Sequence, residues 1–284
     1  MTLPDDFVFS QASLQDYQDC ARRFQLRYLL NLAWPAIDAE PIAEYEAHIA
    51  QADMLHRLIH QHQIGVPAQR LSEMALAADR ELGAGGRLER WWQNYLAYAP
   101  AELPAQRYPE IALSAALAGF RVIAQYDLVA VEPGQKAVIV DWKTSLKRPT
   151  RQWLLGRLQT RVYRYLLARA GAHLNAGQAI SPERVSMIYW FADYPLDPET
   201  LAYDSIQYQA DAAFLAKLIA EIQGREDEIF PLTQDDRQCR FCVYRSLCGR
   251  GAAAGNLAEA DEVSAPEAAW EADFAFEQVA EVEF

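Results

Sequence analysis

Three charged side chains between residues 119 and 165 could share one catalytic site: Asp127, Asp141 and Lys143. Asp141 and Lys143 stand two apart at the end of an apolar run, and alternate residues of a β-strand point to the same face. Carboxylate oxygens bind hard divalent cations, and an ammonium group beside them can polarise a water molecule or a phosphate. Asp-x-Lys triplets are common, so the triplet alone indicates a solvated surface hairpin more readily than a catalytic site.

The apolar runs 120–131 and 137–140 flank the dipeptide Pro133-Gly134, a turn signal, and together they predict a β-hairpin. If the loop is this dipeptide plus the following residue, the numbers of opposed residues add up to 268 and Asp127 faces Asp141. Directly opposed residues have Cβ atoms roughly 4.5–5.5 Å apart, and like charges at that separation destabilise a sheet. A bound cation would reverse the sign of this interaction, so the hairpin register favours a divalent metal site.

The chain has four cysteines, which form a second set of candidate ligands. Cys239, Cys242 and Cys248 follow the spacing C-x2-C-x5-C, and Cys20 lies near the other end of the chain. We expect no disulfides, because the N-terminal residues lack the basic and apolar character of a secretion signal. Four thiolates suit either Zn²⁺ or an iron–sulfur cluster, and the spacing alone does not choose between them.

The periodicity of the rest of the chain predicts the elements that position these side chains. Apolar residues at helical spacing indicate helices over residues 10–32, 41–63, 71–98 with an interruption at 83–86, 150–170 and 204–229. Alternating residues predict a strand over 107–117 before the hairpin, and an apolar run predicts a further strand over 185–191. The order helix, strand, strand, strand, helix, strand indicates an α/β (α+β) fold whose last connection crosses over the sheet.

The helix after the hairpin adds a polar pair, because Gln159 and Tyr163 are four residues apart and share a helix face. An ordinary helix pair has the same spacing, but here it follows Asp127 and the triplet Asp141-Trp142-Lys143. This series resembles the PD-(D/E)XK nuclease superfamily, in its RecB/Cas4/AddB-like iron–sulfur branch, over residues 10–250.

The resemblance implies an αβββαβ restriction-endonuclease-like core with a mixed sheet, extra helices and a four-cysteine cluster that joins the N- and C-terminal segments. This core would form one nuclease domain over residues 1–250. The branch usually has a glycine shortly before the first aspartate, where this chain has Ala124-Gln125-Tyr126. The departure concerns the geometry of the strand end rather than the chemistry.

The resemblance also implies roles for the motif residues. The ligands of Mg²⁺ or Mn²⁺ would be His56, Asp127, Asp141 and the carbonyl of Trp142. Lys143 would position the attacking water and neutralise charge at phosphorus, while Gln159 and Tyr163 would contact the substrate or orient the site. Glu110, on the strand before the hairpin, would lie near the site and support the ligands, and an edge glutamate without such a role is an equal alternative.

Two further matches to the branch are partial. Asp53 stands where the branch has glycine before His56, and a histidine at the polar edge of a helix is the alternative. The stretch from Cys20 to Phe24 resembles the tyrosine-spaced C-P-x-x-F motif, with Ala21 in place of proline. The resemblance therefore implies that Cys20, Cys239, Cys242 and Cys248 hold a [4Fe–4S] cluster that ties the chain ends together, with Zn²⁺ as the alternative.

The formal net charge of −13 argues against nucleic-acid binding over the whole surface. Nine of the 39 acids lie after Arg250, which leaves residues 1–250 with 30 acids and 26 bases. Residues 141–170 carry eight bases and one acid, and beside a carboxylate pair this favours a track for phosphates over a solvated helix face. The bases expected to bind DNA are Lys147, Arg148, Arg151, Arg157, Arg161 and Arg164.

Residues 251–284 are rich in alanine and acids, and we expect a disordered tail there. A solubilising role is the favoured interpretation. The alternatives are a DNA mimic that occupies the basic face and a docking segment for a basic partner such as a helicase.

The sequence thus predicts a metal-dependent DNA nuclease, an exonuclease that acts on single-stranded DNA ends in repair, recombination or related DNA processing. Two alternatives stay open. One is a catalytically degenerate module, stapled by its cysteine cluster, that binds DNA or a helicase, and the other is a zinc-stabilised scaffold. No apolar run approaches 18 residues, so we expect no membrane span and a cytoplasmic protein.

Overall fold

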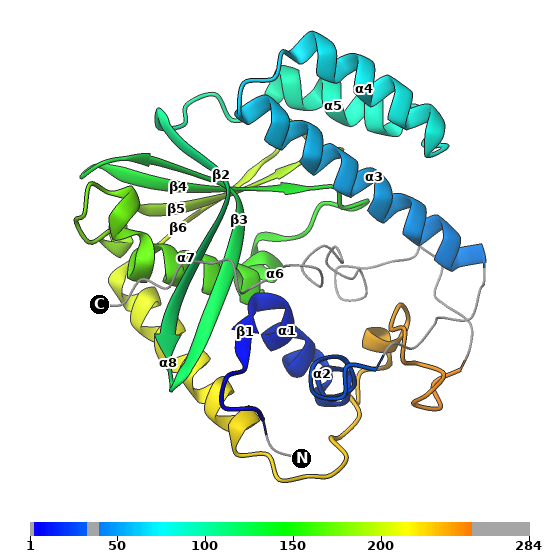
Figure 1. Cartoon of the computed structure of the whole chain (residues 1–284), viewed down its shortest axis with the longest axis vertical. Helices are drawn as coiled ribbons and strands as arrows, with labels where there is room; N and C mark the ends of the chain where they lie inside the picture. The colour runs from blue at the N-terminus through cyan, green and yellow to red at the C-terminus, as the bar shows by residue number, and fades with distance from the viewer. Residues whose placement is uncertain (1–2, 33–39, 252–284) are drawn as a thin grey trace.

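The computed structural model describes residues 3–32 and 40–251, which form a mixed sheet with helices packed on both of its faces (Figure 1). The acidic tail expected over residues 251–284 lies outside the described residues, apart from Gly251. Within the described ranges, no helix has both the length and the apolar character needed to cross a membrane.

The described residues contain a six-stranded sheet. Its strands are β1 (Val8–Ser10), β2 (Gln106–Leu117), β3 (Phe120–Glu132), β4 (Lys136–Lys143), β5 (Val185–Phe191) and β6 (Glu199–Ala202). β3 pairs with β1 and then with β4 along one edge and with β2 along the other, and β5 and β6 continue the sheet beyond β4. The pairs β1–β3 and β4–β5 are parallel and the others antiparallel, which confirms the mixed sheet.

The hairpin of β3 and β4 has the predicted register. Its pairing runs from the turn to Leu128 opposite Val140, so the numbers of opposed residues add up to 268. Gly134 in the turn has a φ of 73°, a left-handed conformation that glycine adopts without steric cost. The hydrogen-bonded ladder stops one pair before Asp127 and Asp141, which therefore stand together just beyond its last rung.

Helices cover the two faces of the sheet as separate layers (Figure 1). One layer consists of α3 (Glu40–Gln63), α4 (Ala68–Glu81) and α5 (Arg87–Tyr98). The other consists of α1 (Gln11–Asp19), α2 (Ala21–Phe24), α6 (Arg151–Gly156), α7 (Leu158–Ala170) and α8 (Ser205–Gln223). Single turns of other helix types add η1 (Gln25–Leu29), η2 (Gly171–Leu174), η3 (Pro182–Arg184) and η4 (Asp236–Cys239).

Each helical layer shares a core with one face of β4. Ile139 belongs to the core that includes α7 and α8, whereas Val138, Val140 and Trp142 belong to the core that includes α3, α4 and α5. Because side chains alternate along a strand, Asp141 points toward the α7 side. The strand therefore presents its carboxylate to the helix that carries Gln159.

Two helices predicted as continuous are interrupted in the structure. The helix expected over 10–32 is broken at Cys20, whose extended backbone (φ −161°, ψ 104°) ends α1. The helix expected over 150–170 is broken at Arg157, which is also extended (φ −71°, ψ 141°). Both breaks lie where the chain meets a distant segment, and local periodicity carries no signal for such contacts.

Other helix ends follow local rules. α8 ends at Gln223 before Gly224, so the prediction that this helix continues to residue 229 was wrong; glycine is a frequent helix terminator. The interruption between α4 and α5 confirms the one predicted at 83–86. There the Asp79 carboxylate accepts hydrogen bonds of 2.7, 2.9 and 3.2 Å from the backbone N–H groups of Gly86, Leu88 and Glu89.

The two ends of the described chain pack against each other, with α2 beside the segment of residues 225–250 (Figure 1). The Gln25 side chain donates to the carbonyl of Glu228 at 2.8 Å and accepts from the N–H of Phe230 at 2.9 Å. These bonds join residues more than 200 positions apart. They bring Cys20 to the segment that carries the other three cysteines.

Candidate active site

Asp127 lies where β3 changes its neighbour. Along one edge of β3, residues 121–123 pair with β1 and residues 128–132 pair with β4. Along the other edge, the ladder with β2 omits the pair of Glu110 and Asp127. Glu110 has a φ of 52°, which is uncommon for a residue other than glycine. Because of this irregular backbone, Glu110 and Asp127 are not paired in the hydrogen-bonded ladder between β2 and β3.

Glu110, Asp127 and His56 each offer one ligand atom, and these three atoms lie within 4.8 Å of one another. His56 comes from α3, and its Nδ1 is 3.3 Å from Oδ1 of Asp127. Gln125 donates from Nε2 to Oε2 of Glu110 at 2.9 Å, and the N–H of Trp142 donates to Oδ2 of Asp127 at 2.7 Å. Each carboxylate is thus held through one of its oxygens by a neighbouring residue.

Asp141, Lys143 and Gln159 form a second group at the end of β4. Lys143 Nζ lies 3.0 Å from Oδ2 of Asp141 and donates to Oε1 of Gln159 at 2.8 Å. Gln159 Nε2 donates to Oδ1 of Asp141 at 2.8 Å. Asp141 and Gln159 are both buried, so Gln159 fixes the acid and the base relative to each other.

The His56–Asp127 contact shifts the pKa of both groups. Burial lowers the pKa of His56, but the Asp127 carboxylate, with smaller contributions from Asp141 and Glu110, outweighs burial and raises this pKa to about 9. Burial raises the pKa of Asp127, but His56 and the N–H of Trp142 outweigh it and hold the pKa below its usual value. The imidazolium and the carboxylate are therefore both charged at neutral pH.

The other two carboxyl groups take up protons more easily than usual. Burial, followed by the negative charge of Asp127, raises the pKa of Glu110 to about 7. Burial also raises the pKa of Asp141 to about 7, with Lys143 opposing this shift and Asp127 adding to it. This group of two buried carboxylates and one partly buried carboxylate is thus short of positive charge, and a proton or a cation can supply it.

The donor set fits Mg²⁺ or Mn²⁺, because carboxylate oxygens are the ligands these hard cations prefer. Oδ2 of Asp141 is buried and accepts no hydrogen bond within the described residues, although it forms the ion pair with Lys143. His56, Glu110 and Asp127 are placed to hold such an ion, with Asp141 beside them. The Glu110 carboxylate thus lies together with the potential ligand atoms of His56 and Asp127.

Tyr163 and Trp142, two further predicted site residues, are buried. The Tyr163 ring centroid is 4.7 Å from that of Tyr126, and the Tyr163 carbonyl accepts from the Tyr126 hydroxyl at 2.9 Å. The Trp142 ring packs edge-on against Tyr95 and Trp190. The Tyr163 ring therefore supports Tyr126, the residue before Asp127, whereas the Trp142 ring belongs to the core that includes α5. Substrate contact by Tyr163 and ligation by the Trp142 carbonyl stay predictions.

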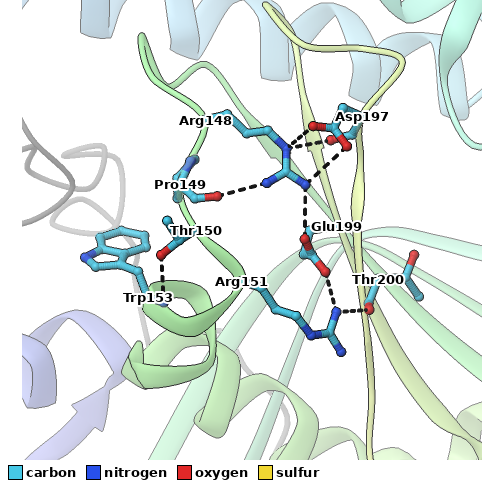
Figure 2. Close-up of polar contacts among 8 residues, drawn as sticks. All are labelled: Arg148, Pro149, Thr150, Arg151, Trp153, Asp197, Glu199 and Thr200. Carbon is cyan, nitrogen blue, oxygen red and sulfur yellow. Dashed lines mark hydrogen bonds and ion pairs between the residues drawn. The ribbon is translucent and has the colours of Figure 1, made fainter.

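Two of the bases expected to bind DNA are held by acids at the start of β6 and in the turn before it, as Figure 2 shows. Arg148 pairs with Asp197 at 2.7 Å and with Glu199 at 3.0 Å. Arg151 also pairs with Glu199 and donates to the carbonyl of Thr200 at 2.9 Å. These contacts fasten the loop between β4 and α6 to β6.

Two more of these bases pack between α7 and α8. Arg161 pairs with Asp211 at 2.9 Å. The Arg164 side chain is 3% exposed, and it donates to the carbonyls of Thr160 and Ala202. Its burial leaves no surface for a phosphate, so part of the charge run joins helices rather than facing solvent.

The remaining two predicted DNA-binding bases lie in the loop after β4 and at the break between α6 and α7. Lys147 is exposed in the loop after β4. The Arg157 guanidinium stacks on the Trp153 ring, 4.8 Å from its centroid. DNA binding by either residue stays a prediction.

The four cysteines are free thiols, each partly exposed. Burial raises the pKa of Cys242 to about 11, with Cys20 and Cys239 adding to the shift and Arg23 opposing it. Cys20 likewise raises the pKa of Cys248, after the larger effect of burial. The thiols are therefore close enough to influence one another's pKa, and their joint ligation of a cluster stays a prediction.

Sequence reasoning gave Glu110 a supporting role and did not single out Gln125. The signal for both was present in the sequence, because Ala118-Gly119 is a two-residue turn between β2 and β3. Its register carries Glu110 to the position opposite Asp127. Gln125, two residues before Asp127 on the same strand, reaches Glu110 from there.

A family model described as the PD-(D/E)XK nuclease superfamily matches residues 8–249, which is most of the chain. The chain belongs to this superfamily. Its mixed sheet and αβββαβ order are those of a restriction-endonuclease-like fold, and membership supports a nuclease that acts on DNA with a divalent metal. Membership in the iron–sulfur branch stays a prediction.

Two solved structures are similar to this PD-(D/E)XK protein at low identity. One is a protein of Eubacterium rectale named as a proposed exonuclease, with 9% identity, a TM-score of 0.45, and coverage of 76% of this chain and 79% of that chain. The other, SSO0001, has 13% identity, a TM-score of 0.35, and coverage of 69% of this chain and 94% of that chain. A search of the curated proteins found no match.

Proposed function

We propose that this protein is a metal-dependent DNA exonuclease that acts on single-stranded DNA ends in repair, recombination or related DNA processing. The observation that carries the proposal is the meeting of Asp127, Asp141 and Lys143 at the end of the hairpin, with His56 and Glu110 beside them. The preference for single strands and for ends rests on the resemblance to the RecB/Cas4/AddB-like branch.

The roles follow from the charges at the site. When bound, Mg²⁺ or Mn²⁺ supplies positive charge at the scissile phosphate and lowers the pKa of an attacking water. The residues that would hold it are His56, Glu110, Asp127, Asp141 and the carbonyl of Trp142. The Lys143 ammonium would stabilise the negative charge that develops on the phosphate. Gln159 keeps that ammonium beside Asp141.

The proposal assigns the four cysteines to a [4Fe–4S] cluster, with Zn²⁺ as the alternative. Support comes from their gathering across the chain ends and from the match of the Cys20 stretch to the branch motif. The cluster would act as a staple between α2 and residues 225–250. Lys147 and Arg157 are the bases best placed to contact phosphates, and a helicase is a candidate partner.

The test is degradation of end-labelled single-stranded DNA with Mn²⁺ by anaerobically purified protein and by its Asp141→Ala variant. We expect the variant to lose cleavage by about a thousandfold, while absorbance at about 400 nm from the cluster is unchanged. Glu132→Ala is the matched control, because Glu132 is an exposed acid at the turn end of the same hairpin.

Each other outcome has a definite meaning. Equal cleavage by wild type and Asp141→Ala would identify a contaminant and refute the proposed site. No cleavage by either would favour the degenerate DNA-binding or helicase-partner module. A colourless protein that contains stoichiometric zinc would replace the iron–sulfur cluster by Zn²⁺.

A further inference from the structure

The N-terminus of α7 is held by a residue from α1. Arg157, the residue before the helix, makes no side-chain hydrogen bond to its first turn. Instead, Oε1 of Gln15 accepts from the N–H of Leu158 at 3.1 Å. The first N–H groups of a helix have no partner within the helix, so an acceptor from elsewhere fixes where the helix begins.

Gln15 is itself fixed on its other side. The side chain is 7% exposed, and its Nε2 donates to Oδ1 of Asp19 at 2.8 Å. Asp19 also pairs with Arg23 through Oδ2 at 3.0 Å. Asp19 and Arg23 flank Cys20, so the Gln15 amide is anchored to the segment that carries the first cysteine.

The residue after Leu158 is Gln159, which hydrogen-bonds to both Asp141 and Lys143. A shift of the α7 N-terminus would therefore move the group that holds the acid and the base together. Misplacement of a catalytic group by about 1 Å can cost about a hundredfold in rate. The geometry points to Gln15 as a positioning residue that sets Gln159, and through it the Asp141–Lys143 pair, against the cysteine-bearing segment.

This inference rests on the proposed function for its kinetic part only. The alternative is that Gln15 merely caps a helix and contributes to stability. The two readings differ, because a cap alone would lower stability without selectively lowering kcat. They also differ in whether a variant that rebuilds the hydrogen bonds with other atoms restores the rate.

The test compares the full chain with three variants. Gln15→Met keeps the side-chain length and removes both hydrogen bonds. In the double variant Gln15→Glu/Asp19→Asn, the new carboxylate accepts from the N–H of Leu158 and from the new amide, so both bonds return and only the bond between residues 15 and 19 exchanges its donor and acceptor. Asp204→Ala is the matched control, because Asp204 caps α8 by accepting from the N–H of Gln207 at 2.7 Å and contacts no residue of the site.

Hydrogen exchange of the segment 157–163 is the first measurement. We expect exchange about tenfold faster in Gln15→Met, near wild type in the double variant, and unchanged in Asp204→Ala. Unchanged exchange in Gln15→Met would overturn the inference. This readout needs no cleavage, so an unchanged exchange rate would overturn the inference even if the wild type proves inactive and the proposed function fails.

Steady-state cleavage is the second measurement. We expect kcat on single-stranded DNA to fall about ten- to a hundredfold in Gln15→Met, with KM and Mn²⁺ affinity unchanged, and to recover in the double variant. A kcat loss of the same size in Asp204→Ala would show that Gln15 affects the rate only by stabilising the fold, as any helix cap does. Failure of the double variant to recover kcat, when its exchange is restored, would also overturn the inference.

Discussion

Glu110 combines a partly buried carboxyl group with a backbone conformation that suits glycine. A φ in the left-handed region costs an ordinary L-residue roughly 1–2 kcal/mol, and its carboxyl lies against Asp127. Strain of this kind persists where the surrounding structure imposes it, often at functional sites. The position of Glu110 therefore costs stability, which fits the ligand role proposed for it.

Glu110→Gly and Glu110→Gln separate these two properties. Without metal, the free energy of unfolding should be up to about 1 kcal/mol higher for the glycine variant than for the glutamine variant, because only glycine removes the steric cost of the positive φ. Both should bind Mn²⁺ at least about tenfold more weakly. Chemical denaturation and titration calorimetry measure the two effects. Equal stability would show an unstrained backbone, and wild-type affinity would remove Glu110 from the ligand set.

The protons at the site predict how metal binding depends on pH. The pKa values of Glu110 and Asp141, about 7, and of His56, about 9, all exceed the ordinary values of 4.5, 3.8 and 6.5. The folded metal-free protein thus binds more protons than the unfolded chain, and the stability these groups contribute falls as pH rises through 7 and then 9. Asp127, with a lowered pKa, has the opposite sign and contributes only above its ordinary range, near pH 4.

A divalent cation replaces these protons, so the rise in Tm caused by saturating Mn²⁺ should be larger at about pH 8.5 than at about pH 6. Differential scanning fluorimetry with and without Mn²⁺ measures it. Asp127→Asn is the control and should show little rise at either pH. An equal rise in wild type at both pH values would contradict proton displacement at this site.

At the scale of elements, the loop between β4 and α6 is tied down along its length. The N–H of Ala192 donates to the Lys143 carbonyl at 2.8 Å, and the Tyr194 hydroxyl donates to the Leu146 carbonyl at 3.1 Å. Arg148 completes the attachment through the acid pairs of Figure 2. The loop that follows Lys143 is therefore fastened to the β5–β6 hairpin.

Lys147 and Arg148 are neighbours with different surroundings, and they should respond differently to mutation. Lys147→Ala should lower the slope of log Kd against log salt for single-stranded DNA by about 0.7, as expected for one lost phosphate contact. Arg148→Ala should leave the slope unchanged and lower the free energy of unfolding by about 1 kcal/mol, because Arg148 pairs with two acids and packs on Phe191. Binding titrations from low to high salt, with a melt of each variant, measure this. A lower slope for Arg148→Ala would show that Arg148 contacts a DNA phosphate after all.

The sequence predicts some elements better than others, because some depend on contacts between residues close in sequence and others on contacts with distant segments. The β3–β4 register follows from a short turn, and a one-residue slip would move every side chain to the other face, so Asp127 and Asp141 could be matched in advance. The breaks at Cys20 and Arg157 depend on partners more than 100 residues away, such as the bond from Leu158 to Gln15. No local pattern encodes such a bond, and the pairing of Arg148 with Glu199 was hidden for the same reason.

At the scale of the whole molecule, the cysteines sit where the two ends of the fold meet. If they hold a cluster, Cys20→Ser should remove the absorbance near 400 nm and speed hydrogen exchange in residues 225–250 and in α2. The sheet, which lies elsewhere, should exchange at its wild-type rate. Exchange mass spectrometry measures each region separately, and unchanged exchange in both end segments would show that the cysteines do not hold them together.

The packing of α2 against residues 225–250 also has a consequence in time. Gln25 leaves the ribosome roughly 200 residues before its partners at Glu228 and Phe230, which at about 5–20 residues per second is a delay of about 10–40 s. The sheet can form in that interval and Gln15 can bond to Leu158, but Gln25 and the segment that carries Cys20 cannot yet acquire their final neighbours. The first residues made are thus among the last to settle. A nascent chain whose cysteines cannot yet meet is the physical result of joining an early segment of the protein to a late one.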